Sequence, residues 1–589
     1  MFVIMYDNKK NKKKLCTWLE CKPLFMFLKF KNEVSSVLSI AMEKSGFKTS
    51  DLALSESPHA DIASSVAFRL APEYRQGPKN ICEKIYRNIK IQPDSYIDRA
   101  EMAGPYINFF ASRAYLNETL LRVLLEREDF GNLNNKGKVI LEHTSANPDG
   151  PLHIGHIRNS VIGDTLARIL KRAGFDVETQ YYINDMGRQI AVVVWGLANF
   201  KFDTTKKTDH AIAEVYINAN KTLVDEKEHS PEVDGIMKQY ETGDNETTKK
   251  FKDAIDTAMQ GIKESLERMN IRHDKFIWES MFVRSGEVNR MIERVRETGR
   301  AGMKDGALMV DLKNEGIQKP LVIQRSDGTS LYTTRDLAYH EWKASQCDRM
   351  IDILGADHKL ISSQLKAVLR ILGLKEPEIV IFEFVSLPEG SMSTRRGVFI
   401  SADELLDQVE KAAYDEVNKK RPETGEDFKK KVAAFVGIGA VRYDIIRVSP
   451  EKATTFDWKE ALDFEKQGAP FIQYSHARAC SILKNAKDEG FVFDMFDPSL
   501  LVEEQEVTLI KKLASFENVI DNSARELKPN LMAIYARELA DAFNQFYRYV
   551  PVLSVEPEYR ASRLALVDCS RIVLANALDT LGITAPESM

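Results

Sequence analysis

Two histidines at the start of a segment with apolar periodicity are the residues of this chain best suited to chemistry on a phosphate. His153 and His156 flank Gly155, an apolar run at 138–143 precedes them, and apolar residues recur at helical spacing over 157–170. A helix start offers unpaired backbone N–H groups and the positive end of the helix dipole, and both favour an anion. The imidazoles add further N–H donors, and the glycine lets a planar ring approach the backbone closely. The segment therefore predicts a phosphate site between a strand and a helix.

The elements that must position this site form two similar units. A second strand is expected at 176–182, and a later unit combines a strand at 348–354, a turn at 355–358, a helix at 360–372 and a strand at 378–385. Two strand–helix–strand units predict a doubly wound parallel (Rossmann-like) sheet that binds ligands at the carboxyl ends of its strands. The chain contains neither a Gly-x-Gly-x-x-Gly nor a P-loop motif, so dinucleotide and P-loop functions lack their loops.

Length and composition limit the classes of protein to which this chain can belong. The 589 residues suggest three or four domains, and no apolar run of about 18 residues is long enough to span a membrane. A net charge of −5 excludes a generally basic nucleic-acid binder but permits a local basic face. The six cysteines include no Cys-x-x-Cys pair, which argues against structural zinc and for a reducing compartment, so we expect a cytoplasmic protein.

A strand followed by His-Ile-Gly-His and then a helix resembles the signature of class I aminoacyl-tRNA synthetases. Five upstream residues narrow the resemblance to the arginyl-tRNA synthetases of the archaeal type: Glu142, Ser145, Ala146, Asn147 and Pro148. The resemblance covers nearly all of the chain after Met26. It implies a ligase that activates L-arginine with ATP to arginyl-adenylate and transfers it to tRNA(Arg), releasing AMP and pyrophosphate.

The resemblance also implies a multidomain protein, α/β plus all-α, that acts as a monomer. Residues 26–130 would form an α+β appended domain that holds the tRNA elbow. A catalytic domain would follow at 136–430, with a helical insertion at about 197–300, and a helical anticodon-binding domain at 431–589. Residues 1–25 are expected to be either a disordered extension or a misassigned start, and the second is favoured.

Amino-acid activation is an in-line attack of a carboxylate on the α-phosphate, so positioning and charge neutralisation matter more than a general base. His153 and His156 suit that task as donors, and their protonation state is left open. ATP would enter with Mg²⁺. The resemblance assigns to ATP binding Ala146, Asn147, Pro148, Leu152, Gly155, Asn159, Gly355 and Asp357.

A second phosphate element of the class is a flexible Lys-Met-Ser-Lys-Ser loop. Residues 391–397, Ser-Met-Ser-Thr-Arg-Arg-Gly, stand in its place, and Met392 and Ser393 match it. Both lysines are replaced, by a serine and a threonine. We therefore expect Arg395 or Arg396 to bring positive charge to the pyrophosphate, or magnesium to contribute more.

A guanidinium group prefers carboxylates that bind it through two hydrogen bonds beside an aromatic wall. The resemblance places Tyr332 and Asp336 at this head group, and their spacing of four residues puts both on one helix face. At the α-amino and carboxylate ends it places Glu142, Ser145 and Asn147. His358 stands where many relatives carry glutamine, so its part in the pocket is less defined.

Aromatic residues with a few donors suit unstacked tRNA bases. The candidates are Phe109, Tyr474, Arg478, Phe543, Tyr547 and Met589. A core position is the alternative for Phe109, Tyr474 and Phe543, whereas Arg478 and Tyr547 are the preferred tRNA contacts.

Three alternatives share some of these features. Another class I synthetase would share the histidines, but the pattern Tyr332-x-x-x-Asp336 suits a cationic substrate. A small nucleotidylyltransferase would leave the region after residue 397 unexplained. A tRNA-binding paralogue without catalysis should have lost the histidines or the loop, and both are present.

Overall fold

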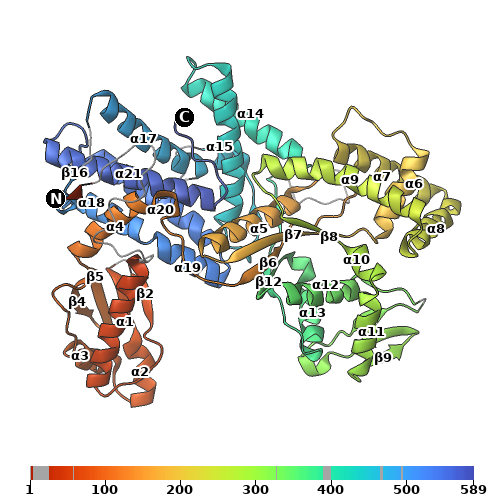
Figure 1. Ribbon diagram of the computed structural model, residues 1–589, viewed down its shortest axis with the longest axis horizontal. Helices are drawn as coiled ribbons and strands as arrows, with labels where there is room; N and C mark the ends of the chain where they lie inside the picture. The colour runs from red at the N-terminus through yellow and green to blue at the C-terminus, as the bar shows by residue number, and fades with distance from the viewer. Residues whose placement is uncertain are drawn as a thin grey trace.

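In the computed structural model the molecule is elongated, with the C-terminal helices at one end and an inserted helical layer at the other (Figure 1). The structure describes residues 2–3, 26–57, 59–326, 328–388, 400–463, 468–491 and 495–589. Strand β1 (Phe2–Val3) pairs antiparallel with β16 (Met495–Phe496). Residues 4–25 lie outside the described residues, so the expectation for the N-terminal extension stays a prediction.

A five-stranded parallel sheet lies at the centre. Its order is β13 (Glu378–Phe382), β12 (Arg349–Gly355), β6 (Lys138–Glu142), β7 (Asp176–Ile183) and β8 (Lys275–Trp278). The chain starts at the middle strand, β6, runs outward through β7 and β8, and then returns to the other side of β6. The point at which the strand order reverses lies between β6 and β12, and the crevice there is where such sheets bind ligands. The predicted doubly wound fold is confirmed.

The first half of the sheet carries the helical insertion. Helix α5 (Ile154–Arg172) joins β6 to β7, and α6 to α9 follow at Arg188–Asn199, Thr208–Asp225, Ser230–Glu241 and Asn245–Arg268. The predicted end of the insertion near residue 300 is wrong, because β8 returns to the sheet and pairs with β7. A strand of four residues is too short to give a clear periodic signal.

Between the two halves lies a small unit that the sequence did not predict. Helices α10 (Glu279–Arg284) and α11 (Glu287–Glu297) are followed by an antiparallel sheet of β9 (Ala301–Lys304), β10 (Ala307–Val310) and β11 (Leu321–Gln324). Helix α12 (Tyr332–Gln346) then leads into β12, and α13 (Lys359–Ile371) joins β12 to β13. The strand predicted at 378–385 is two strands, since β14 (Val385–Ser386) leaves the main sheet and pairs with β15 (Thr454–Thr455).

An α+β unit forms the N-terminal part of the described chain. Its antiparallel sheet has the order β2 (Leu54–Ser57), β3 (Ala60–Ser64), β5 (Tyr106–Ala111) and β4 (Ile97–Ala103). The helices of this part are α1 (Met26–Lys44), α2 (Val66–Tyr74), α3 (Pro78–Tyr86) and α4 (Arg113–Glu126).

From residue 402 the described chain is almost entirely helical. The helices are α14 (Ala402–Lys420), α15 (Glu426–Ile446), α16 (Trp458–Ala461), α17 (Ala469–Asp488), α18 (Glu504–Ala514), α19 (Phe516–Glu526), α20 (Asn530–Tyr549) and α21 (Pro557–Thr580). No helix among the described residues is both long and apolar enough to cross a membrane.

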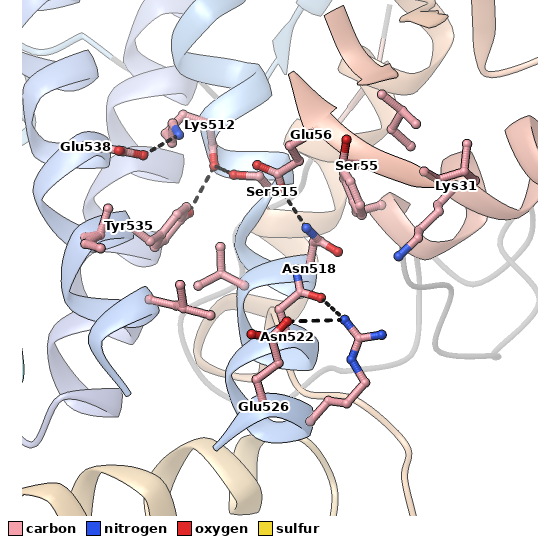
Figure 2. Close-up of a pocket in the computed structure, with 17 residues that line it drawn as sticks. Lys31, Ser55, Glu56, Lys512, Ser515, Asn518, Asn522, Glu526, Tyr535 and Glu538 are labelled. Carbon is pink, nitrogen blue, oxygen red and sulfur yellow. Dashed lines mark hydrogen bonds and ion pairs between the residues drawn. The ribbon is translucent and has the colours of Figure 1, made fainter. Parts of the chain in front are cut away.

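The N-terminal unit rests on these helices. The backbone N–H of Phe27 donates to Glu517 on α19 at 3.0 Å, and Asn518 donates to Glu56 on β2. Beside this contact is a cleft of about 460 Å³, in which Lys512 pairs with Glu538 at 2.9 Å (Figure 2). The polar lining of the cleft is thus largely paired within the protein.

Candidate active site

The loop that follows β6 is held in an unusual backbone conformation. Thr144 and Ser145 have φ of 70° and 41°, which places two residues with side chains in the left-handed region. Asn159 accepts from the Thr144 N–H at 2.7 Å, the Thr144 and Ser160 hydroxyls are 2.7 Å apart, and the Tyr182 N–H donates to the Ser145 hydroxyl at 3.0 Å. Such strain persists where the surroundings over-determine it, and it concentrates at functional sites.

The two histidines form the N-terminal cap of α5. Nδ1 of His153 accepts from the backbone N–H groups of Gly155 at 3.0 Å and of His156 at 3.3 Å. The N–H of His153 in turn donates to Nδ1 of His156 at 3.4 Å, and the rings stack with centroids 3.7 Å apart. A Cβ on Gly155 would lie 2.9 Å from the His153 ring, so the close approach that needs glycine is made by the motif's own histidine.

This capping geometry decides the protonation state that the sequence left open. A ring nitrogen that accepts a hydrogen bond carries no proton, so both imidazoles are neutral and carry their proton on Nε2. Burial lowers the pKa of His153, and burial together with His153 lowers the pKa of His156 to about 3. The helix start thus presents two stacked neutral N–H donors.

Two of the predicted ATP-binding residues also make structural contacts within the protein. The Asn159 side-chain amide donates to the carbonyl of Ile353 at 3.0 Å while its oxygen accepts from the loop after β6, so it joins that loop to β12 at the switch point. Leu152 is completely buried, and its carbonyl accepts from the Ala402 N–H at 2.7 Å.

Most of the remaining ATP-binding candidates line the same end of the sheet. Gly355 is the last residue of β12, Asp357 is exposed in the turn that follows, and the carbonyl of buried Ala146 accepts from the Tyr181 hydroxyl at 2.7 Å. Pro148 is buried in the loop that leads to the histidines.

Met392, Ser393, Arg395 and Arg396 lie in the segment 389–399, outside the described residues. The chain is described again from residue 400, beside the histidines: Ser401 forms a β-bridge with His153 and caps α14. The C-terminal flank of the predicted loop is therefore anchored at the phosphate end of the site.

The carboxylates predicted to bind arginine belong to a chain of alternating charges. Nζ of Lys343 donates to Glu142 at 3.0 Å and to Asp352 at 2.7 Å. Asp352 in turn lies 2.8 Å from Nε2 of His340, whose Nδ1 is 3.0 Å from the carboxylate of Asp336. Lys343, His340 and Asp352 are almost completely buried, whereas the terminal carboxylates, Glu142 and Asp336, are 13% and 31% exposed. The two ends of the chain are thus partly exposed, at the carboxyl end of β6 and on α12, while its middle is buried.

The fold explains how these residues meet. Glu142 and Asp352 are register partners on β6 and β12, the two strands that flank the switch point. The other three residues lie on α12, four and three positions apart, and so share one helix face. Burial raises the pKa of Glu142 although Lys343 opposes this. Burial would also raise the pKa of Asp352, but its two cations outweigh burial and hold it well below its usual range.

The other predicted arginine-binding residues fall into two groups, those near the charged chain and those with other partners. The Ser145 hydroxyl donates to Glu142 at 3.1 Å, and Tyr332 is half exposed at the first turn of α12, so both lie with the charged chain. Asn147 instead donates to Gln189 at 2.7 Å, and His358 pairs with its neighbour Asp357 at 3.1 Å. The described contacts therefore favour the first two residues over Asn147 and His358 as pocket residues.

Sequence reasoning missed His340, Lys343 and Asp352. The positions 332, 336, 340 and 343 continue one helix face, and this periodicity was the available signal. It also missed Tyr182, whose buried hydroxyl has no partner among the described residues. Burial, together with the negative charges of nearby carboxylates such as Glu279 and Asp336, raises the pKa of Tyr182 well above its usual value. An unpaired buried hydroxyl in this position suits a polar ligand group.

The predicted tRNA contacts separate by burial. Phe109 on β5 and Phe543 on α20 are completely buried in the core, so neither ring offers a face to a base, and the prediction is wrong for both. Tyr474 and Tyr547 are 42% and 45% exposed, and the Arg478 guanidinium lies over both rings, 4.7 and 4.8 Å from their centroids.

Met589 lies close to the exposed platform formed by Tyr474, Arg478 and Tyr547. Met589 lines a cavity of about 410 Å³ together with Tyr474, Phe471, Lys420 and Arg421. The carbonyl of Thr584 accepts from Gln473 at 2.9 Å and that of Pro586 contacts His476 at 2.9 Å, so α17 holds the end of the chain in place.

A doubly wound sheet with capping histidines at its switch point defines the catalytic domain of a class I aminoacyl-tRNA synthetase. Residues 119–458 match the family model described as tRNA synthetases class I (R), catalytic domain. Residues 29–111 match the arginyl tRNA synthetase N terminal domain, and residues 472–589 match the DALR anticodon binding domain.

Similar proteins agree over the whole length. The arginine–tRNA ligase of Methanosarcina barkeri is 62% identical over 569 residues, 96% of this chain and all of that protein, and that of Archaeoglobus fulgidus is 49% identical over 564 residues, 96% of this chain and again all of that protein. The solved arginyl-tRNA synthetase of Thermus thermophilus superposes with a TM-score of 0.84 at 26% identity, covering 95% of this chain and all of the other. The chain belongs to the arginyl-tRNA synthetase family, and its activity is the ATP-dependent ligation of arginine to tRNA.

Proposed function

We propose that His153 and His156 bind the phosphates of ATP as neutral donors. The observation that carries this assignment is their reciprocal cap, which directs both Nδ1 atoms to the backbone, so that each ring carries its proton on Nε2. Neutral donors and the positive end of α5 stabilise the charge that develops as pyrophosphate leaves. Mg²⁺ enters with ATP as part of the substrate, and Arg395 or Arg396 adds the positive charge that the replaced lysines would carry.

L-Arginine binds with its guanidinium at Asp336 and Tyr332 and its α-amino and carboxylate ends toward Glu142 and Ser145. Support comes from the partial exposure of both carboxylates at the switch point, beside the histidines in the fold. One carboxylate oxygen of arginine attacks the α-phosphorus, and the bond from that phosphorus to the pyrophosphate oxygen breaks. A terminal hydroxyl of the tRNA then attacks the carbonyl carbon of arginyl-adenylate and AMP leaves.

The tRNA is read at the far end by the platform of Tyr474, Arg478 and Tyr547, next to the cavity of Met589. Two exposed rings with a guanidinium between them can stack on unpaired bases. The N-terminal unit holds the tRNA elbow, and the protein acts as a monomer in the cytoplasm.

The deciding assay measures arginine-dependent exchange between ATP and pyrophosphate, with and without tRNA(Arg). We expect exchange with tRNA present for arginine and not for glutamate, cysteine or leucine. Exchange that depends on another amino acid, or none with tRNA present, would contradict the proposal. Sedimentation of the same sample reports whether the active species is a monomer.

A further inference from the structure

The buried middle of the charged chain has no assigned part in the reaction. Lys343 and His340 touch neither the crevice nor solvent, yet each bridges Asp352 to one of the two carboxylates that reach the crevice. A charged lysine with no exposed surface is costly to bury unless it is fully paired. The fold therefore keeps this lysine at the switch point although its burial costs free energy.

His340 carries a positive charge in this arrangement. Nε2 faces the Asp352 carboxylate, while Nδ1 faces the carboxylate of Asp336 at 3.0 Å and its backbone carbonyl at 2.8 Å. Both nitrogens thus meet only acceptors, and only the imidazolium can donate from both. Burial and Lys343 oppose the charge, but the two aspartates outweigh them and raise the pKa of His340 to about 10.

The charges can then be counted. Three carboxylates, those of Glu142, Asp352 and Asp336, face two cations, those of Lys343 and His340. The remaining groups around the lysine are aromatic: its Nζ lies 4.2 Å from the centre of the Tyr339 ring, which stacks on Tyr182 at 4.7 Å. Among these five groups one negative charge is left over, at the partly exposed ends of the chain; the neighbouring Glu279 is paired with Arg335 at 3.1 Å.

We propose that Lys343 and His340 are positioning and specificity residues for arginine: they orient Glu142 and Asp336 as charged acceptors and leave the pocket one negative charge, matching the single net positive charge of the amino acid. This inference rests on the proposed placing of arginine between these two carboxylates. The buried cations never touch the substrate. They act through the carboxylates, because a charged donor fixes the orientation of each and favours its charged form.

The test is the Lys343→Met variant of the full chain, assayed by aminoacylation of tRNA(Arg). Loss of a charge-assisted hydrogen bond to a buried carboxylate should raise the KM for arginine by about tenfold or more, with the KM for ATP unchanged within about twofold. Because Lys343 opposes the burial that raises the pKa of Glu142, its removal should raise that pKa further. The value of kcat/KM for arginine should then rise with pH between about 6 and 8, more steeply than in the wild type.

Lys429→Met is the matched control, because Lys429 is also buried but donates to Asn418 at 2.7 Å and to the Pro422 carbonyl at 3.1 Å, with no link to the crevice. It should leave the KM for arginine and the pH profile unchanged. If the Lys343→Met variant does not fold, the His340→Gln variant tests the proposal in its place. It should raise the KM for arginine about threefold or more and leave the KM for ATP unchanged.

The outcomes separate the two proposals. If Asp336→Ala leaves arginine use intact, the proposed pocket is wrong and this inference falls with it. If Asp336→Ala abolishes arginine use but Lys343→Met, or His340→Gln in its place, keeps a wild-type KM and pH profile, the pocket stands and the positioning role is overturned.

Discussion

The proposed ATP end and the proposed arginine end of this active site are built in opposite ways. At the ATP end, two histidines three residues apart cap one helix and hold each other through backbone hydrogen bonds. At the arginine end, residues from β6, α12 and β12 meet in one chain of charges, although Glu142 and Lys343 are separated by 201 positions in the sequence. One end is a local motif and the other is a product of tertiary structure.

The two ends also use different electrostatics. Burial keeps the capping histidines neutral, so they can donate to phosphates without a charge that would hold pyrophosphate after it leaves. The histidine of α12 is more deeply buried than the capping pair, but it lies between two carboxylates and is therefore charged. The same residue type therefore has opposite protonation states at the two ends because its partners differ.

The largest expected loss of activity is at the proposed arginine end, whose residues come from distant parts of the sequence. Replacing Asp336 by alanine removes a carboxylate at the guanidinium and should lower kcat/KM for arginine roughly 10³-fold, since a charged head group would lose its paired acceptor. Steady-state aminoacylation measures this. Glu341→Ala on the same helix removes a carboxylate that pairs with Arg294 instead, and it should leave arginine use unchanged. Retained arginine activation in Asp336→Ala would remove this residue from the pocket.

The local motif should give the next largest effect. We expect His156→Ala to lower kcat about 100-fold, because a donor to the transition state is lost, with little change in the KM for arginine. Single-turnover formation of the adenylate measures the step. His229→Ala is the control, because His229 is paired with Glu226 and Glu232 in the insertion. A rise in the KM for arginine with kcat intact would contradict the division between the two ends.

The motif also predicts a pH dependence of stability. The unfolded chain protonates His156 near its ordinary pKa of 6.5, whereas the folded protein resists protonation until about pH 3. The contribution of His156 to the free energy of unfolding is thus present above pH 6.5 and is lost as the pH falls toward 3. Denaturant titrations should show a smaller loss over this range in His156→Ala than in the wild type. Equal losses in both proteins would contradict the neutral cap.

A smaller effect is expected from the basic pair at positions 395 and 396, which precedes α14 in the sequence. Replacing Arg395 and Arg396 together by alanine should reduce exchange between ATP and pyrophosphate by about tenfold, because the remaining donors are neutral. Arg370→Ala removes an exposed arginine that pairs with Glu376 and serves as the control. Unchanged exchange would transfer the charge-neutralising role to the magnesium ion.

The smallest effect lies outside both ends. Tyr547→Ala removes one exposed ring of the platform and should raise the KM for tRNA about tenfold, the equivalent of one stacked base. The KM for arginine should not change. Phe543→Leu, four residues earlier on α20 but buried, should lower the melting temperature and leave the KM for tRNA alone. The reverse result would show that the platform is not the tRNA contact.

Much of the fold could be predicted, because strand and helix periodicities are local. The parallel sheet, the helix after His153 and the helical C-terminal region follow from such patterns, whereas β8 and the small sheet of β9 to β11 are too short to give one. The same limit applies to side chains. Phe109 and Tyr547 are both aromatic residues with helical or strand spacing, and only packing decides that the first is buried and the second exposed.

For the site, the sequence by itself determined that the two histidines lie at the start of a helix after a strand, because both patterns are local; their reciprocal cap became visible only in the structure. It also determined that Tyr332 and Asp336 share a helix face. Only the tertiary structure decided that Lys343, His340 and Asp352 complete the arginine end, because strand register brings Asp352 beside Glu142 and no local pattern encodes register across distant strands. The protonation states of the histidines were likewise decided only by the tertiary structure, since the charge of a histidine depends on the groups that folding places around it.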